Sequence, residues 1–148
     1  MFSKEEKKII KQAKKILKSH INDQAYLENP DTVRTFLQLQ FSELEHEVFG
    51  ALFLTQRHQI ICYQEIFRGT IDGASVYPRE IVKEAMKQNA AAIIFAHNHP
   101  SGDVTPSQAD RRLTDRLIDA LSLIDVRVID HVVVSIKGTI SFAEQGYL

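Results

Sequence analysis

The chain has only one cysteine, Cys62, and no apolar run near the ~20 residues that a membrane-spanning helix needs. A single cysteine cannot form an internal disulfide, which is typical of a reducing cytoplasm, and we expect a cytoplasmic protein. The N-terminus also lacks the apolar segment of a signal peptide. The sequence therefore predicts no association with a membrane.

An excess of charge is lacking as well, because the formal net charge is −1 at pH 7. This balance gives no general attraction to nucleic acid. The exception is the segment 2–20, a lysine-rich amphipathic helix by its periodicity, whose apolar stripe is formed by Ile9, Ile10, Ala13, Ile16 and Leu17. We expect the stripe to pack on the domain and the lysines to be solvated. Contact with DNA, RNA or an acidic partner is the weaker alternative.

Internal repeats and low-complexity tracts are absent too, and 148 residues suffice for one ordinary domain. We expect a basic helix and a linker in residues 1–30 and a single domain in residues 31–148. Residues 21–30 are the expected linker, since Asn-Pro-Asp at its end punctuates the chain. The sequence does not predict an oligomeric state.

Changes in hydrophobic periodicity divide the domain into helices and strands. Helices are predicted over 31–45, 78–89 and 106–123, and strands over 48–54, 60–69, 90–96, 126–135 and 139–142, of which the first two are expected to form a hairpin. In the helix predicted over 78–89 we expect four residues to point inward: Ile81, Val82, Ala85 and Met86. A Gly-punctuated connection is expected over 69–74. The predicted fold class is α/β, with a mixed β-sheet of about five or six strands flanked by helices.

Two histidines end the apolar strand of residues 90–96. His97 and His99 are two residues apart, so in an extended chain both imidazoles project to the same side. This is a metal-ligand spacing, although a lone His-x-His is more often a pair of solvent-exposed residues. The loop that follows is rich in proline and glycine, and it separates the strand from the next helix.

The start of that helix strengthens the metal hypothesis. We expect Thr105 as its N-cap, with Pro106 in the first turn and Gln108 completing a capping box. Ser107 and Asp110 are then three residues apart on one helix face, directed toward the histidines. Two imidazoles and one carboxylate leave a fourth tetrahedral position open, as catalytic zinc requires, so Zn²⁺ is the predicted cofactor with His97, His99 and Asp110 as its ligands.

This pattern resembles a known signature. His-Asn-His, seven residues and then Ser-x-x-Asp is similar to the JAMM motif of the JAB/MPN metallopeptidase-like domains. The surrounding segments resemble the bacterial RadC family of that superfamily: His-Asn-His-Pro-Ser-Gly-Asp from residue 97, Gly69-Thr70, Pro78-Arg79-Glu80 and Asp130-His131. The resemblance covers residues 31–148 and implies a JAB/MPN fold with cytidine-deaminase-like architecture. RadC proteins also carry an N-terminal helix-hairpin-helix region, which we expect this chain to lack.

A hydrolytic zinc site also needs a carboxylate outside the coordination shell to accept a proton from water. Glu43, Glu45 and Glu47 are the candidates before the strand at residue 48, and alternation does not separate the last two. The resemblance assigns this role to Glu47. The alternative is that all three are solvated charges.

Ser107 has two interpretations. Its hydroxyl can donate a hydrogen bond to an oxyanion that forms at the metal site, or it can only cap the helix. Asp130 and His131 also have two: they orient a metal ligand by hydrogen bonding, or they form a local buried pair. The residues alone decide neither question.

Other functions fit the sequence less well. In an HNH nuclease the three letters lie far apart, and a zinc deaminase needs a Pro-Cys-x-x-Cys segment that the single cysteine cannot supply. The serious alternative is a non-catalytic RadC-like binding module associated with DNA repair or DNA metabolism. Because the whole JAMM set is present, we predict a zinc-dependent metallohydrolase that cleaves a peptide or isopeptide bond. Its expected partner is a peptide or protein substrate, branched linkages included, and the sequence does not specify which.

Overall fold

The computed structural model of the chain describes residues 1–21, 30–69 and 76–148, and for Ile21 only the backbone. The elements in chain order are α1 (Lys4–Ile21), α2 (Pro30–Phe41), β1 (Val48–Leu54), β2 (Ile60–Arg68), α3 (Pro78–Lys87), β3 (Ala92–Asn98), α4 (Gln108–Ser122), β4 (Arg127–Ser135) and β5 (Gly138–Ser141). The linker expected over 21–30 and the connection expected over 69–74, with the motif residue Thr70, fall mainly outside the described residues.

The strands form one five-stranded mixed sheet in the order β2-β1-β3-β4-β5. Only β3 and β4 pair in parallel, and α4 connects them, whereas the other neighbours are antiparallel. The hairpin of β1 and β2 confirms the prediction from their adjacent apolar runs. The mixed sheet and its flanking helices confirm the predicted α/β class.

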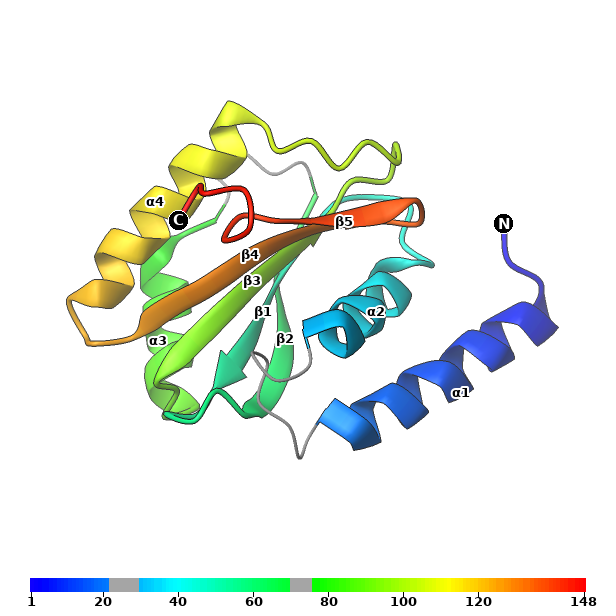
Figure 1. Cartoon of the computed structure of the whole chain (residues 1–148), viewed down its shortest axis with the longest axis horizontal. Helices are drawn as coiled ribbons and strands as arrows, with labels where there is room; N and C mark the ends of the chain where they lie inside the picture. The colour runs from blue at the N-terminus through cyan, green and yellow to red at the C-terminus, as the bar shows by residue number, and fades with distance from the viewer. Residues whose placement is uncertain (22–29, 70–75) are drawn as a thin grey trace.

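Helices cover both faces of the sheet, so the molecule has three layers. One core cluster joins α2 to one face of the sheet, and the other joins α3 and α4 to the opposite face (Figure 1). All seven residues of β1 and all seven of β3 are buried, which explains why these strands read as continuous apolar runs. The carboxyl end of β3 meets the start of α4 at one edge of this core.

Two sequence expectations about helix faces need correction. Met86 was expected to point inward on α3, but it is 67% exposed, whereas Ile81 and Ala85 are buried. The helix is short and packs through a narrow stripe, which leaves the next position on the turn in solvent. On α1, Leu17 packs against the core, but Ile9 and Ile16 are exposed, so only part of the predicted apolar stripe faces the domain.

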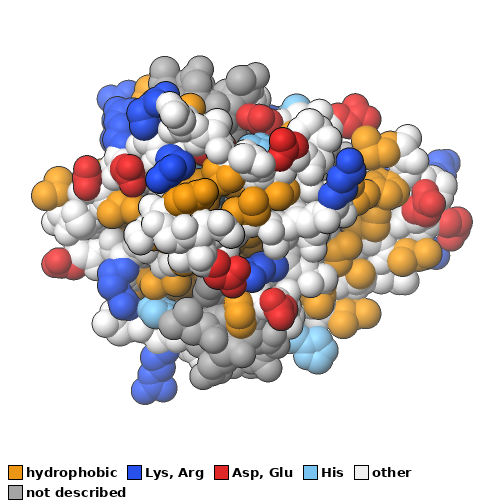
Figure 2. Space-filling model, turned by 45° about the horizontal axis from the view of Figure 1, so that its top comes forward, with side chains coloured by type: hydrophobic (Ala, Val, Ile, Leu, Met, Phe, Trp, Pro, Cys, Tyr) orange, Lys and Arg blue, Asp and Glu red, His pale blue; other side chains and the backbone are white. Residues whose placement is uncertain are grey.

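The surface shows the same mixture of charges as the sequence. Figure 2 shows acidic and basic side chains scattered across the displayed face rather than separated by sign. Among the described residues, no helix combines the length and the hydropathy that crossing a membrane would require. Neither feature selects a partner.

Candidate metal centre

The alternation of β3 places His97 on the face of the sheet covered by α4. Ile93 and Phe95 point to that face, and His97 follows two residues later with its side chain completely buried. His99 lies just beyond the strand, where its backbone N–H still donates to the carbonyl of Val134 at 2.9 Å. The two imidazoles therefore start from the end of a rigid, buried strand.

The start of α4 differs from the prediction. The N-cap is Ser107, and the expectation that Thr105 caps the helix with Gln108 as its partner is wrong. The backbone N–H of Thr105 donates to the side chain of Asp103 at 2.9 Å, which keeps the chain in a turn before Pro106. A residue that precedes proline also disfavours helical geometry, so the helix begins only after this segment.

A reciprocal capping box closes this helix start. The Ser107 hydroxyl accepts a hydrogen bond from the backbone N–H of Asp110 at 3.0 Å, and Asp110 Oδ2 accepts one from the backbone N–H of Ser107 at 2.8 Å. These bonds satisfy two backbone donors that the helix itself leaves unpaired. The same bonds fix the direction of the Asp110 carboxylate, which points away from α4 toward β3.

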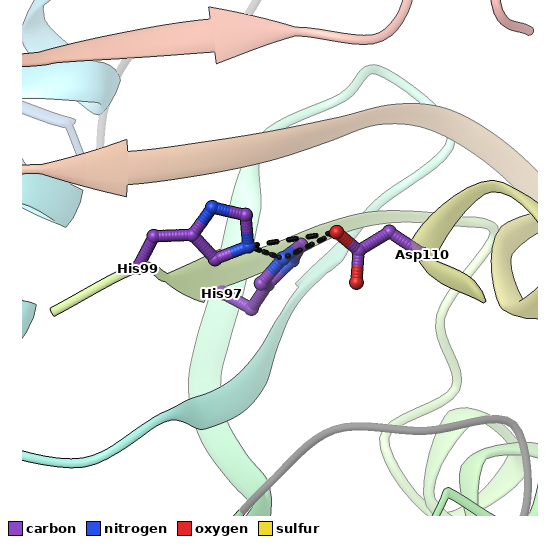
Figure 3. A group of neighbouring side chains, drawn as sticks. All are labelled: His97, His99 and Asp110. Atoms are coloured by element: carbon purple, nitrogen blue, oxygen red, sulfur yellow. Dashed lines mark hydrogen bonds and ion pairs between the residues drawn. The ribbon is translucent and has the colours of Figure 1, made fainter. Parts of the chain in front are cut away.

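Three potential ligand atoms meet between β3 and α4 (Figure 3). The Nε2 atoms of His97 and His99 lie 3.0 Å apart, and they lie 3.4 and 3.5 Å from Asp110 Oδ2. Tetrahedral zinc with bonds of about 2.0–2.2 Å holds its ligand atoms about 3.3–3.6 Å apart. The two distances to Asp110 fall within this range, whereas the two imidazole nitrogens lie about 0.3 Å closer than its lower end, and these three residues could hold a metal ion.

The orientation of His99 leaves its Nε2 atom suited to a metal. Its Nδ1 lies 2.8 Å from the backbone carbonyl of Asp103, and a carbonyl oxygen only accepts hydrogen bonds, so Nδ1 carries the proton. A neutral His99 then presents an unprotonated Nε2 to Asp110. Protonation of Nε2 would let the imidazolium donate a hydrogen bond to the Asp110 carboxylate, which raises the pKa of His99.

Asp110 is held in its ionised form. Burial opposes ionisation, but the two imidazoles beside the carboxylate and the Ser107 N–H outweigh that effect, so the pKa of Asp110 lies well below its usual value. The side chain is nearly inaccessible, with the whole residue 4% exposed. A buried carboxylate of this kind needs a cation or hydrogen-bond donors as partners, which agrees with a metal-binding role.

His131 and Asp130 perform separate tasks. His131 Nε2 lies 2.7 Å from Nδ1 of His97, which supports the interpretation that His131 orients a ligand. Burial lowers the pKa of His131 well below its usual value, and the neighbouring His97 adds to this effect. Asp130 instead accepts hydrogen bonds from the backbone of His131 and Ala143 and from the hydroxyl of Ser141, which ties β4 to the segment after β5.

Thr114 is a site residue that the sequence analysis missed. Its hydroxyl lies 2.6 Å from His131 Nδ1 and donates to the backbone carbonyl of Asp110 at 2.8 Å. The available signal was its position one helical turn after Asp110, between apolar residues of the buried face. The contact with His131 has no local signal, because it depends on how β4 lies beneath α4.

Strand register places Glu47 beside this site. Glu47 lies two residues before Phe49, which pairs with His97 in the antiparallel ladder, and it lines the same pocket as His99. The backbone carbonyl of Glu47 also accepts a hydrogen bond from the backbone N–H of Gly69 at 2.9 Å. Glu45, its rival two residues earlier, is exposed.

Glu47 and Ser107 share a pocket of about 340 Å³ with His99 and Asp110. The pocket is lined mainly by polar side chains from the loop between β3 and α4, and it opens to solvent beside the ligand atoms. Ser107 caps α4, as one of its two interpretations required. The catalytic roles of Glu47 and Ser107 stay predictions.

Comparison with known proteins agrees with this geometry. Residues 27–147 match the family described as RadC-like JAB domain. A UPF0758 protein of Vibrio cholerae is 52% identical over 144 residues, which is 97% of this chain and 90% of that protein. A UPF0758 protein of Stutzerimonas stutzeri is 49% identical over 140 residues, but the alignment spans only 62% of its length. The chain therefore belongs to the family of RadC-like JAB domains.

Proposed function

We propose that this protein is a zinc-dependent hydrolase of amide bonds, of the peptidase or isopeptidase type. The observation that supports the proposal best is the shared pocket, in which two candidate ligands, His99 and Asp110, lie beside the carboxylate-bearing Glu47. Three protein ligands leave zinc an open position, and hydrolysis needs a base next to that position. The JAB family includes metallohydrolases, which agrees with this chemistry.

The three candidate ligands, Glu47 and Ser107 have distinct roles in the proposal. When bound by His97, His99 and Asp110, zinc supplies a Lewis acid that lowers the pKa of water and polarises a carbonyl. Glu47 accepts the proton of the attacking water and transfers it to the leaving amine. The Ser107 oxygen accepts a hydrogen bond from the backbone of Asp110, so its own hydrogen stays available to donate to the oxyanion.

The substrate class follows from the same chemistry. An open pocket lined by polar side chains suits an extended peptide segment or a branched isopeptide linkage. The second candidate function is a binding module with an unused metal site, associated with DNA metabolism. The carboxylate of Glu47 supports the hydrolase over the binding module, because a binding module has no need for a base in the pocket of His99 and Asp110.

Metal analysis is the first test. We expect protein purified without chelator to contain close to one zinc ion per chain, and the His99→Ala variant to contain far less, because it loses one of three ligands. His58→Ala is the matched control, since His58 is hydrogen-bonded to Arg127 away from the pocket. Equal and negligible zinc in the wild type and in His99→Ala would contradict the proposal.

Activity requires a separate test with peptide and isopeptide substrates. Glu47→Gln should keep the zinc content and lower kcat by about 10²–10⁴-fold, because proton transfer by a positioned side chain contributes that much. Glu45→Gln, which changes an exposed glutamate two residues away, should leave both quantities unchanged. Equal turnover by Glu47→Gln and the wild type would exclude Glu47 as the base.

A further inference from the structure

A buried chain of hydrogen bonds connects two of the candidate ligands behind the metal centre. His97 Nδ1 lies 2.7 Å from His131 Nε2, and His131 Nδ1 lies 2.6 Å from the Thr114 hydroxyl. That hydroxyl lies 2.8 Å from the backbone carbonyl of Asp110. From Asp110 on α4, this chain of hydrogen bonds passes through Thr114, also on α4, and His131 on β4. It ends at His97 on β3.

The hydrogen bond from Thr114 to the carbonyl of Asp110 fixes the position of every other proton in this chain of hydrogen bonds. The carbonyl of Asp110 only accepts, so Thr114 uses its single hydroxyl hydrogen there. The Thr114 oxygen must then accept from His131, which places the proton of that ring on Nδ1. A neutral His131 has no proton left on Nε2, and it accepts a hydrogen bond there from Nδ1 of His97.

The surroundings of His131 keep it neutral. The residue has no exposed surface, and its ring stacks on Phe142 with centroids 4.5 Å apart. The rings of Phe49 and Phe95 approach it edge-on at 5.5 and 6.1 Å. A cation in this aromatic enclosure would lose its hydration, and each ring nitrogen already has a hydrogen-bond partner.

The outcome for His97 is one defined tautomer. Its proton lies on Nδ1, so Nε2 is unprotonated and faces Asp110 Oδ2 at 3.4 Å. His99 has the same tautomer, because its Nδ1 donates directly to the backbone carbonyl of Asp103. The lone pairs of the two Nε2 atoms, 3.0 Å apart, then face each other and Asp110 Oδ2 without a proton between them, an arrangement that favours a cation at the centre.

We propose that Thr114 and His131 are positioning residues that hold His97 in the tautomer able to bind a metal ion through Nε2. The inference rests on the metal site of the proposed function, and it is independent of whether the bound metal hydrolyses any substrate. Partners that orient ligands in this way commonly change metal affinity by 10–100-fold when they are removed. Because the chain of hydrogen bonds starts at the Asp110 backbone and ends at His97, it also couples the position of α4 to that of β3.

The tautomers are directly measurable in the wild type. Long-range ¹H–¹⁵N NMR of metal-free protein with labelled histidine distinguishes a protonated Nδ1 from a protonated Nε2. We expect the proton on Nδ1 in both His97 and His131, at a pH where the two rings are neutral. A proton on Nε2 of His97 would overturn the proposal without any variant.

Two substitutions of Thr114 test the effect on metal binding. Thr114→Val keeps the shape but removes the acceptor, so the His131 proton moves to Nε2 and the His97 proton moves toward the metal position. We expect zinc affinity, measured by competition with a chromophoric chelator, to fall by about 10–100-fold. Thr114→Ser keeps the hydroxyl and should bind zinc nearly as the wild type does.

The pair of variants separates positioning from simple loss of packing. If the amide NMR spectrum shows that Thr114→Val is unfolded, two measurements still test the proposal. They are the zinc affinity of Thr114→Ser relative to the wild type and the histidine tautomers of the wild type. Unchanged zinc affinity and an unchanged His97 tautomer in folded Thr114→Val would overturn the proposal. Zinc binding with the expected tautomers but no hydrolysis would contradict the proposed function alone.

Discussion

Asp110 shows how one side chain can serve the fold and the site together. Its Oδ2 accepts a hydrogen bond from the Ser107 backbone and also lies 3.4 and 3.5 Å from the two imidazoles. A carboxylate oxygen has two lone pairs, so both interactions are compatible. Helix capping therefore aims the carboxylate without any metal, which would reduce the cost of ordering this candidate ligand on metal binding.

Cys62 is a second residue whose surroundings change its chemistry. Burial raises the pKa of its thiol, and the charge of Glu84 adds to the shift. Since only the thiolate reacts, alkylation of the native protein near pH 8 should be slower than that of free cysteine. The pH midpoint of the reaction rate should also lie higher, as measured with iodoacetamide at several pH values.

The unfolded chain provides the control for this cysteine. In concentrated urea the thiol loses its burial, so its rate should approach that of the free amino acid. A native midpoint at or below that of free cysteine would contradict the effect of burial.

At the scale of elements, the contact between β1 and β2 depends on a missing side chain. A Cβ added at Gly50 would lie 2.6 and 2.7 Å from ring carbons of Tyr63 and would also meet its hydroxyl. Tyr63 packs against the core and forms an edge-on contact with Phe41, with ring centroids 6.1 Å apart. The ring can move only by disturbing this packing.

Gly50→Ala should therefore lower the free energy of unfolding by about 1–3 kcal/mol, the usual cost of overpacking. Urea denaturation of metal-free protein measures the change. Gly138→Ala is the matched control, since no atom lies within 4 Å of its added Cβ, and we expect a change within about 0.5 kcal/mol. Equal stability of the two variants would refute the steric explanation.

At the scale of the whole molecule, the metal centre joins parts that are distant in sequence. His97 belongs to β3, His99 to the loop after it and Asp110 to α4, and the chain of hydrogen bonds adds β4. A metal that binds only the folded arrangement stabilises the entire domain by mass action. The site and the fold are therefore thermodynamically linked.

Zinc should accordingly raise the melting temperature of the metal-free protein. At a free concentration of 100 times Kd, we expect about 2.7 kcal/mol, or roughly 5–11 °C for a chain of this size. Differential scanning calorimetry measures the shift, which His58→Ala should retain and His99→Ala should largely lose. The same shift in His99→Ala and the wild type would mean that zinc stabilises the protein elsewhere.

Much of the fold was predictable because its signals are local. The apolar runs of β1 and β3 and the periodicity of α4 identify buried strands and an amphipathic helix within short windows. The separation of His97, His99 and Asp110 along the sequence is likewise a local signal. The N-cap was misplaced by two residues because Thr105 and Ser107 are both favourable N-cap residues, each with a possible capping-box partner three residues later, and the loop geometry selects Ser107.

The sequence by itself determined the three candidate metal ligands, the order of elements and the α/β class, because each of these follows from residue type and spacing along the chain. Only the tertiary structure decided that Glu47 lines one pocket with His99, that Met86 is exposed and that His131 contacts both His97 and Thr114. Those relations depend on strand register and on the packing of α4 over β4. Both arise from contacts between residues far apart in the chain, which no local pattern records.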